Sequence, residues 1–415
     1  MQRLALFPFL AVGMLWLASF APACAAEAPT LTLRSPHHAC HNAVIRFVLP
    51  SGLKQRLFGR QGGSLVLERN TKGSREWLLC QVGLENGQAL ATFVLPDLAA
   101  GETQVYALRR IHSPLAQSVR VVPKGETADV FLGPSLFTRY GTTKGANKPF
   151  FYPILTPNGH SITRRWPMET IPGESRDHPH HRGLWFTHGS VNGIDFWSEG
   201  QGTGRTTTTA IEDIASGPVY GGFRAKTEWR APDGKLLAND TREVLIYPLP
   251  DGSRLLDFTI TLTPVGGPLV FGDTKEGTFG LRLADSLALT GKQGAHILTS
   301  SGQRDGNAWG KPADWVDDYG PLGGQIYGVA ILDHPGNLRH PPGWHARDYG
   351  LFAVNPFCRY DFHLGPKGSG DYTLPPGQTL TFRYRVLFHL GDTAAAGVAD
   401  QYASYAGPPD VQLHW

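Results

Sequence analysis

A chain of 415 residues, 41% of them hydrophobic, is long enough for two or three domains with substantial cores, which excludes a disordered chain. The formal net charge is only +3 and no run of lysine or arginine accompanies it, so the electrostatic pattern of a nucleic-acid-binding protein is missing. Charged residues make up 18% of the chain, and 50 glycines and 32 prolines favour strands and turns over helices.

The first 26 residues have the pattern of a secretory signal peptide. Arg3 precedes an apolar run from Leu4 to Phe20, and small residues follow. We expect cleavage after Ala25 or Ala26, and the alternative is an uncleaved membrane anchor. No later segment reaches the roughly 18 apolar residues that cross a bilayer. The mature chain is therefore predicted to be exported, periplasmic or extracellular, with no membrane span.

Export leaves three cysteines in the mature chain. Cys40 and Cys80 both lie in the N-terminal region and could form a disulfide in an oxidising compartment. Cys358 follows the apolar stretch 351–357, so we interpret it as a small buried hydrophobic residue and not as a nucleophile.

Residues 27–122 are predicted to form a small N-terminal β domain. Short apolar runs alternate there with Gly, Pro and Asn, which is typical of a small all-β unit. The runs are 44–49, 64–67, 77–82, 91–95 and 104–108. They contain few side chains suited to catalysis, so we assign this domain to packing or orientation. Residues 123–130 are interpreted as a linker.

Residues 123–415 are predicted to form a large antiparallel β-sandwich with a short C-terminal helix. The clearest strands are 242–248, 254–264, 278–288, 325–332, 350–354 and 378–390. In the last of these the apolar residues alternate with Arg383, Arg385 and His389, which predicts a half-buried strand. Only the alanine-rich segment 393–405 is predicted as a helix, so the fold class is all-β.

The segment 176–200 holds four of the sixteen histidines within eleven residues. Proline disfavours the helical basin for the preceding residue, so His178 is predicted to be extended and the residues after it to continue as a strand. On a strand, Asp177 and His178 would point to opposite faces, although a bend could bring partners together. Because imidazole binds metals and shuttles protons near neutral pH, this cluster suggests a functional site.

Two further polar clusters compete with the histidine segment for the role of active site. The segment 271–283 places Glu276 at the mouth of a strand and Arg282 within it. Glu276 could ligate a metal, act as a general base, or be a solvated turn residue. The segment 333–350 is a proline-rich loop after a strand, of the kind that shapes a binding site. It contributes His334, Trp344, His345 and Arg347.

Metal binding is one of two interpretations of these clusters. Imidazoles plus a carboxylate are common ligands of a catalytic divalent metal, and the predicted ligands are His178, His180 and His345. The alternative, which we prefer, is a metal-free site of histidines and arginines that grips polyols or carboxylates. The spacing matches no tight metal template, and no nucleophile elbow, phosphate loop or dinucleotide fingerprint is found.

Tryptophans in or beside the clusters favour a carbohydrate ligand. Trp185, Trp309 and Trp344 are predicted to bind substrate together with Arg282 and His334, because apolar rings flanked by polar groups suit a sugar. A place in the core is the alternative for each tryptophan.

The run DHPHHRGLWFTHGSVNGIDFW resembles an exported bacterial family labelled PmoA-like, after a methane oxygenase. The resemblance extends through FGDTKEGTFGLRLADS, SSGQRDGNAWGKPADWVDDYG and GVAILDHPGNLRHPPGWHARDYGLFAVNPF, so it covers most of residues 140–390. The polar positions that match are His178, His180, His181, Arg182, Glu276, Arg282, His334, His345 and Arg347. The label implies a metal-dependent oxygenase, which is kept as an alternative.

The strand-rich C-terminal part is also similar in style to the large β-sandwiches of galactose-mutarotase-like enzymes. That resemblance implies histidines and a carboxylate on a concave sheet face, where they move protons on sugars.

Our leading hypothesis is an exported enzyme that acts on a carbohydrate or glycoside by proton transfer or C–O bond cleavage, as a lyase, hydrolase or epimerase. His181 and Glu276 would be acid and base, and Arg182 and Arg347 would hold anionic or carbonyl oxygens. The alternatives are a non-catalytic glycan-binding protein and the oxygenase. The hypothesis requires that the three clusters converge on one pocket; the substrate and the oligomeric state stay open.

Overall fold

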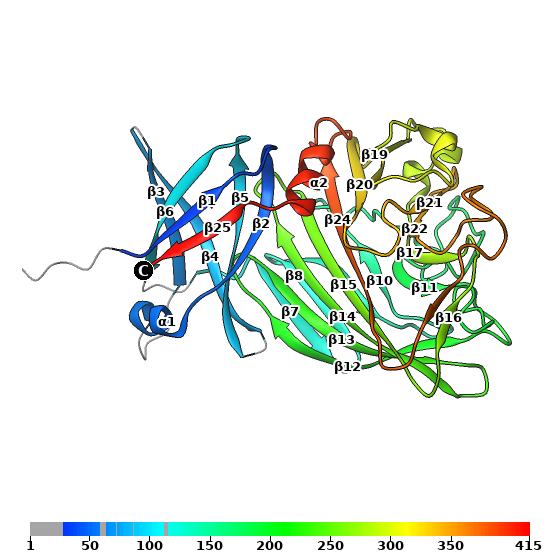
Figure 1. The fold of residues 1–415 in the computed structure, drawn as a ribbon. Coiled ribbons are helices and arrows are strands. Elements are labelled where there is room, and N and C mark those ends of the chain that lie inside the picture. The colour runs from blue at the N-terminus through cyan, green and yellow to red at the C-terminus, as the bar shows by residue number, and fades with distance from the viewer. Residues whose placement is uncertain (1–27, 59–63, 72, 86, 112–114) are drawn as a thin grey trace, which may run out of the picture.

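The computed structural model describes residues 28–58, 64–71, 73–85, 87–111 and 115–415. Over these residues the chain forms antiparallel β-sheets with two α-helices, one of them short and C-terminal, which confirms the predicted fold class (Figure 1). The predicted signal peptide lies outside the described residues. Within the described ranges, no helix is both long and apolar enough to cross a membrane.

The N-terminal region forms a seven-stranded sheet and the helix α1 (Ser51–Phe58). The strand order is β2 (Cys40–Val48), β5 (Gln88–Leu98), β4 (Ser74–Glu85), β3 (Ser64–Thr71), β6 (Thr103–Ile111), β1 (Thr30–Arg34) and β25 (Asp410–His414). The first half of β4 pairs with β3 and its second half with β5, so the sheet turns on itself around one core.

The last strand of the chain lies in this first sheet. β25 pairs antiparallel with β1, from Thr30 opposite His414 to Arg34 opposite Asp410, and covers the backbone edge that β1 would otherwise expose (Figure 1). The predicted division at residue 122 stays a prediction. The predicted linker 123–130 is wrong, because β7 (Val119–Lys124) and β8 (Thr127–Leu132) pair as a hairpin of the second sheet.

Two eight-stranded sheets form the sandwich. The second sheet has the order β21 (Gly343–Ala346), β22 (Leu351–Asn355), β17 (Gly277–Arg282), β11 (Leu184–His188), β10 (Phe150–Ile154), β9 (Ser135–Gly141), β8 and β7. The third has the order β12 (Arg205–Ala215), β13 (Gly221–Arg230), β14 (Leu236–Pro248), β15 (Arg254–Pro264), β24 (Leu380–Leu390), β20 (Gln325–Asp333), β19 (Trp315–Leu322) and β18 (His296–Thr299). A two-stranded sheet pairs β16 (Leu269–Phe271) with β23 (Tyr372–Leu374).

Alternate residues of both large sheets point inward and form the main core. Phe186, Phe279 and Val354 lie in one cross-strand row of the second sheet, opposite Phe258 and Phe382 of the third. Each such buried side chain contributes about 1.5–3 kcal/mol of transfer free energy. Short 3-10 helices, η1 (Asp285–Leu287), η2 (Leu289–Gly291) and η3 (Asp305–Ala308), occupy connections. The predicted strand 278–288 therefore ends at residue 282.

The outer face of the third sheet is covered by the N-terminal sheet and by α2 (Val398–Ala406), as Figure 1 shows at their junction. Gln81 accepts hydrogen bonds from the backbone N–H groups of Val219 and Tyr220, both at 3.1 Å. Arg385 and His389 of β24 are buried beneath this cover. The prediction that β24 is half-buried is thus wrong for its second half, since other parts of the chain close its polar face.

The outer face of the second sheet carries a cross-strand row that supports the candidate site. Trp185 on β11 pairs with Phe150 on one side and Gly280 on the other, followed by Ala353 and then His345 on the edge strand β21. A Cβ on Gly280 would lie 3.0 Å from the Trp185 ring. The small residues in the middle of the row therefore let this ring lie across the sheet.

All three described cysteines are free and buried, which confirms the prediction for the third and contradicts a disulfide between Cys40 and Cys80. Gln81 pairs with Thr92, and Thr92 pairs with Arg46, so Cys80 lies level with residue 45. At about 3.3 Å per residue, Cys40 is roughly 16 Å further along the strands. That separation is too long for a disulfide.

Candidate functional site

The histidine segment forms a loop, not the predicted strand. β11 begins only at Leu184, and His178 has φ of +42°, in the left-handed region. The cause is tertiary: the buried guanidinium of Arg164 donates hydrogen bonds to the carbonyl oxygens of His178 at 2.9 Å and of His181 at 3.5 Å. These bonds fix a turn that local preference does not favour.

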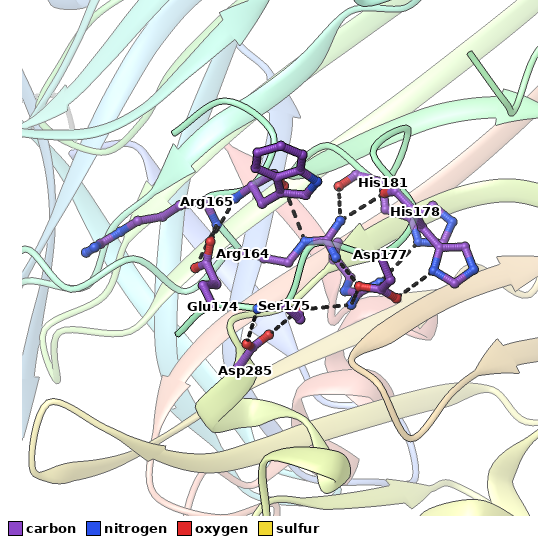
Figure 2. A network of polar contacts seen from close by, with 10 residues as sticks. Arg164, Arg165, Glu174, Ser175, Asp177, His178, His181 and Asp285 are labelled. Atoms are coloured by element: carbon purple, nitrogen blue, oxygen red, sulfur yellow. Dashed lines mark hydrogen bonds and ion pairs between the residues drawn. The ribbon is translucent and has the colours of Figure 1, made fainter. Parts of the chain in front are cut away.

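Asp177 lies against two buried arginines (Figure 2). Its Oδ1 accepts hydrogen bonds from Arg164 Nη1 at 2.5 Å and Arg282 Nη2 at 2.7 Å, and its Oδ2 accepts one from Arg282 Nη1 at 3.2 Å. Burial raises the pKa of Asp177, but the hydrogen bonds from Arg282 and His178, with the charges of both arginines, outweigh burial and lower it to about 2. The carboxylate is therefore ionised at neutral pH.

Two more carboxylates anchor the loop on the other side, as Figure 2 shows. Asp285 accepts hydrogen bonds from the backbone N–H of Ser175 at 2.7 Å and from its Oγ at 2.6 Å. Glu174 accepts the backbone N–H groups of Arg165 and Trp166. Hydrogen bonds therefore hold the loop both before Asp177, at residues 174 and 175, and after it, at the carbonyls of His178 and His181.

His178 is paired with the carboxylate next to it. Its Nδ1 donates to Asp177 Oδ2 at 2.5 Å, a contact that the left-handed backbone allows and a strand would forbid. The imidazole is 42% exposed. Among the described residues no group hydrogen-bonds to Nε2, so this nitrogen is free to exchange a proton with a bound molecule.

A stack of rings rises from the sheet and holds the orientation of His178. His181 stacks on Trp185 with centroids 5.5 Å apart, His178 lies on His181 at 4.8 Å with an angle of 3°, and Tyr349 lies on His178 at 5.0 Å with an angle of 7°. The centroids of His181 and Tyr349 are only 6.4 Å apart, so these two rings lie side by side against His178 and not on its opposite faces. One ring nitrogen binds Asp177, and the other makes no hydrogen bond within the described residues.

His181, predicted as the catalytic acid or base, lies beneath His178. It is 1% exposed, and its Nδ1 is 3.4 Å from Arg282 Nη1. Burial first, and then the neighbouring His180 and Arg282, lower its pKa well below the usual value. His181 is therefore a neutral ring within the stack, and its Nε2 has no partner among the described groups.

Arg182 is engaged in a buried ion pair. Its Nε and Nη2 donate to both carboxylate oxygens of Glu199 at 2.8 Å. Lys148, which is fully buried, donates to the Trp197 carbonyl at 2.7 Å and lies 3.5 Å from Glu199 Oε1. Burial lowers the pKa of Lys148 to about 8, and burial with the Lys148 charge lowers that of His180 to about 4.

Glu276 and His345 come from the two other sequence clusters. Glu276 is 35% exposed, and burial, with the charge of Asp195, raises its pKa against the opposing charge of Lys275. His345 lies on a strand and not on the predicted loop; its Nδ1 donates to the Lys275 carbonyl at 3.0 Å, and burial lowers its pKa to about 3. Tyr349 of the third cluster lies 5.0 Å from His178 and 4.9 Å from the Arg282 guanidinium, so the three clusters come together here.

Arg347 lies between two rings and has no carboxylate partner among the described residues. Its guanidinium carbon is 5.7 Å from the centroid of Trp309 and 5.6 Å from that of Tyr349. Its buried Nε makes no hydrogen bond. The Trp309 ring that Arg347 contacts also lines a cavity of 290 Å³, together with Lys275, Tyr360, Asp361 and His363.

Two predicted substrate residues lie elsewhere. Trp344 is fully buried in the sandwich core, and its Nε1 donates to the Ala313 carbonyl at 2.8 Å. His334 lines a different cavity, beside Tyr405 of α2. Among the described residues no three His, Cys, Asp or Glu side chains are placed to hold a metal ion, so the predicted ligands do not form such a group. Metal binding stays a prediction.

Sequence reasoning missed Asp177 and Tyr349 as site residues. Asp177 was assigned to the face opposite His178 because the loop was predicted as a strand. Its position beside four histidines was the available signal. Tyr349 had no local signal, since its stacking on His178 depends on how β21 and β22 bring their connection over the second sheet.

The chain belongs to the DUF6807 family, a family of unknown function. The family model matches residues 127–403, which include the whole candidate site and all of the sandwich except β7. The description of the family has no PmoA label. No curated protein matches the chain.

Solved structures that resemble the chain include two proteins from Enterococcus faecalis. One is described as a protein in glycosyl hydrolase family 38, with 13% identity and a TM-score of 0.36. The match spans 94% of this chain and 47% of the other protein's chain. The other is described as an alpha-mannosidase, with 10% identity and a TM-score of 0.38. That match spans 94% of this chain and 46% of the alpha-mannosidase chain. The chain spans about half the length of these structures, and TM-scores this low establish no functional likeness.

Proposed function

We propose that the protein is an exported acid–base enzyme that acts on a carbohydrate or glycoside. The observation that supports this most directly is the Asp177–His178 pair, whose imidazole lies against stacked rings, is 42% exposed and keeps one nitrogen without a hydrogen bond among the described residues. An ionised carboxylate on Nδ1 selects the tautomer with a basic Nε2 and stabilises the imidazolium that forms when this atom takes a proton. His178, rather than the buried His181, is thus our candidate base.

Glu276 is the candidate acid. Its pKa is raised by burial, so a larger share of the carboxyl is protonated near neutral pH than for an exposed glutamate. A proton taken from the substrate by His178 and a proton given to the leaving oxygen by Glu276 would together achieve C–O bond cleavage. The same two groups would achieve epimerisation if the proton were returned to the opposite face of the carbon.

Arg347 and the rings around it supply recognition. Its unpaired guanidinium, flanked by Trp309 and Tyr349, offers N–H donors to a carbonyl or carboxylate oxygen of the substrate. The cavity of 290 Å³ that Trp309 lines has an aromatic wall and polar groups, as sugar sites have.

The test is a turnover assay of the purified protein against neutral and uronic-acid oligosaccharides, with products followed by mass spectrometry. The wild type should convert at least one glycan, and Glu276→Gln should lower kcat by about 10²–10⁴-fold, the usual contribution of a general acid. Glu212→Gln, on the exposed strand β12, is the matched control and should retain full activity. Conversion by E276Q at the wild-type rate would refute the role of Glu276.

Binding without any product would favour the alternative of a glycan-binding protein, which the stacked rings also suit. Elemental analysis of the purified protein tests the oxygenase alternative, for which stoichiometric copper or iron is required. The family membership alone supports neither activity.

A further inference from the structure

A second cavity, of 330 Å³, lies between the N-terminal sheet and the outer face of the third sheet. Its floor comes from β14, β15 and β24, where Glu243 pairs with Thr259 and Thr259 with Arg383 in one cross-strand row. Arg46 of β2 and Tyr405 of α2 also line it. His334, which the sequence singled out for substrate binding, belongs to this cavity and not to the candidate site.

Three buried polar groups at this cavity have no protein partner among the described residues: the hydroxyls of Tyr247 and Tyr384 and the Nε of Arg46. Tyr247 is fully buried, and its hydroxyl makes no hydrogen bond. The Nε of Arg46 also makes none, although its Nη2 pairs with Glu85. Burial, followed by the charge of Asp257, raises the pKa of Tyr247, so the hydroxyl stays a donor. Because folded proteins satisfy nearly all buried polar groups, these donors indicate a polar occupant.

The charges around the cavity cancel. The cations are Arg46, Arg383 and Arg385, and the carboxylates are Glu85, Glu243 and Asp257. Arg385 binds Asp257 through two hydrogen bonds of 2.6 and 2.7 Å, so this pair is already neutral. Glu243 has no ion-pair partner within the described ranges, and burial with the charge of Glu85 raises its pKa. Neither an anion nor a cation is therefore preferred.

We propose that this cavity is a second binding site, specific for one uncharged sugar or polyol. Its volume is at the small end of the roughly 300–1,000 Å³ of ligand sites and equals the space of about ten water molecules. The Tyr247 hydroxyl and Arg46 Nε donate to ligand hydroxyls, and Glu243 accepts from them. Since the walls belong to the N-terminal sheet, the third sheet and α2, the ligand stabilises their junction. This site does not depend on the proposed activity.

Calorimetric titration and thermal melting with glucose, galactose, maltose and mannitol test the proposal. Tyr247→Phe removes only the unpartnered hydroxyl and should weaken binding of the preferred sugar at least tenfold, while the melting temperature without ligand holds or rises. Glu243→Gln keeps the hydrogen-bonding groups and should bind within about threefold of wild type, because the ligand is uncharged.

Tyr140→Phe is the matched control, since this buried hydroxyl already has a partner in Thr208 at 3.3 Å. It should lower the melting temperature and leave sugar binding unchanged. The proposal is overturned if no neutral sugar binds in a Tyr247-dependent manner. It is also overturned if Y247F melts as low as Y140F, which would show a cavity that holds only water. Tighter binding of glucosamine or gluconate than of glucose would overturn the proposal that the ligand is uncharged.

Discussion

The two large sheets have equal numbers of strands but opposite surroundings on their outer faces. On the third sheet, the N-terminal sheet and α2 cover the face, and there Asp317 accepts hydrogen bonds from His389 Nε2 at 2.9 Å and Thr393 Oγ1 at 2.6 Å. On the second sheet the face is open above the ring stack, and there His178 binds Asp177. Each face thus has a histidine–aspartate pair.

A histidine–aspartate pair therefore does not by itself identify a reactive site. His389 and Asp317 have side chains that are 1% and 0% exposed, and both nitrogens of His389 face acceptors, the second being the Leu390 carbonyl at 3.4 Å. His178 is accessible and uses only one nitrogen. Access and a free nitrogen, not the residue types, therefore distinguish the two pairs.

The largest expected effect comes from replacing the histidine of each pair. His178→Asn should lower kcat by about 10²–10⁴-fold with little change in melting temperature, because it removes a proton-transfer group from an accessible position. His389→Asn should do the reverse, with normal activity per folded molecule and a lower melting temperature, because it leaves the buried Asp317 without its cation. Equal effects of the two variants on kcat would show that the open face has no special role.

The next effect concerns Asp177, which holds two buried arginines. Asp177→Asn should lower the free energy of unfolding by about 2–3 kcal/mol, somewhat below the 3–5 kcal/mol for breaking a fully buried pair, because this carboxylate is one-third exposed. Asp97→Asn, which loses an exposed pair with His41, is the control and should cost less than about 0.5 kcal/mol. Urea unfolding of both variants measures the difference.

A smaller effect is expected at the top of the ring stack. Tyr349→Leu should lower kcat about tenfold, equivalent to ~1.4 kcal/mol, because one face of His178 loses its stacking partner and the imidazole gains freedom. Tyr349→Phe keeps the ring and should retain most activity. A loss in Y349F as large as in Y349L would point instead to a chemical role for the hydroxyl.

The two pairs should stabilise the fold over opposite ranges of pH, because the pKa of His389 is raised and that of Asp177 is lowered. Burial lowers the pKa of His389, but the charge and hydrogen bond of Asp317 outweigh it and raise the pKa. Its stabilisation is therefore complete below the unfolded value near 6.5 and is lost as pH rises through the folded pKa. Asp177, with a lowered pKa, contributes above about pH 4 and loses this contribution as pH falls toward 2. Urea titrations of H389N and D177N should each lack one of these two changes.

Elements whose side chains follow a regular period could be predicted from the residues alone. Alternation along 380–388 and 254–264 gave β24 and β15, since a strand must bury every second residue of its core face whatever lies around it. The polar residues of the three clusters were also visible, because Arg, His and Glu at that density are costly in a core.

Which of these residues contact one another depends on packing between segments that are distant in the chain. Arg164 bends the loop so that Asp177 and His178, which a strand would separate, share a hydrogen bond. α2 buries the face of β24 that its pattern predicts as exposed, and His334 lines a cavity on the third sheet whereas His345 lies on β21 of the second. The physical reason is that ion pairs and docking between distant segments outweigh local backbone preferences of about 1 kcal/mol.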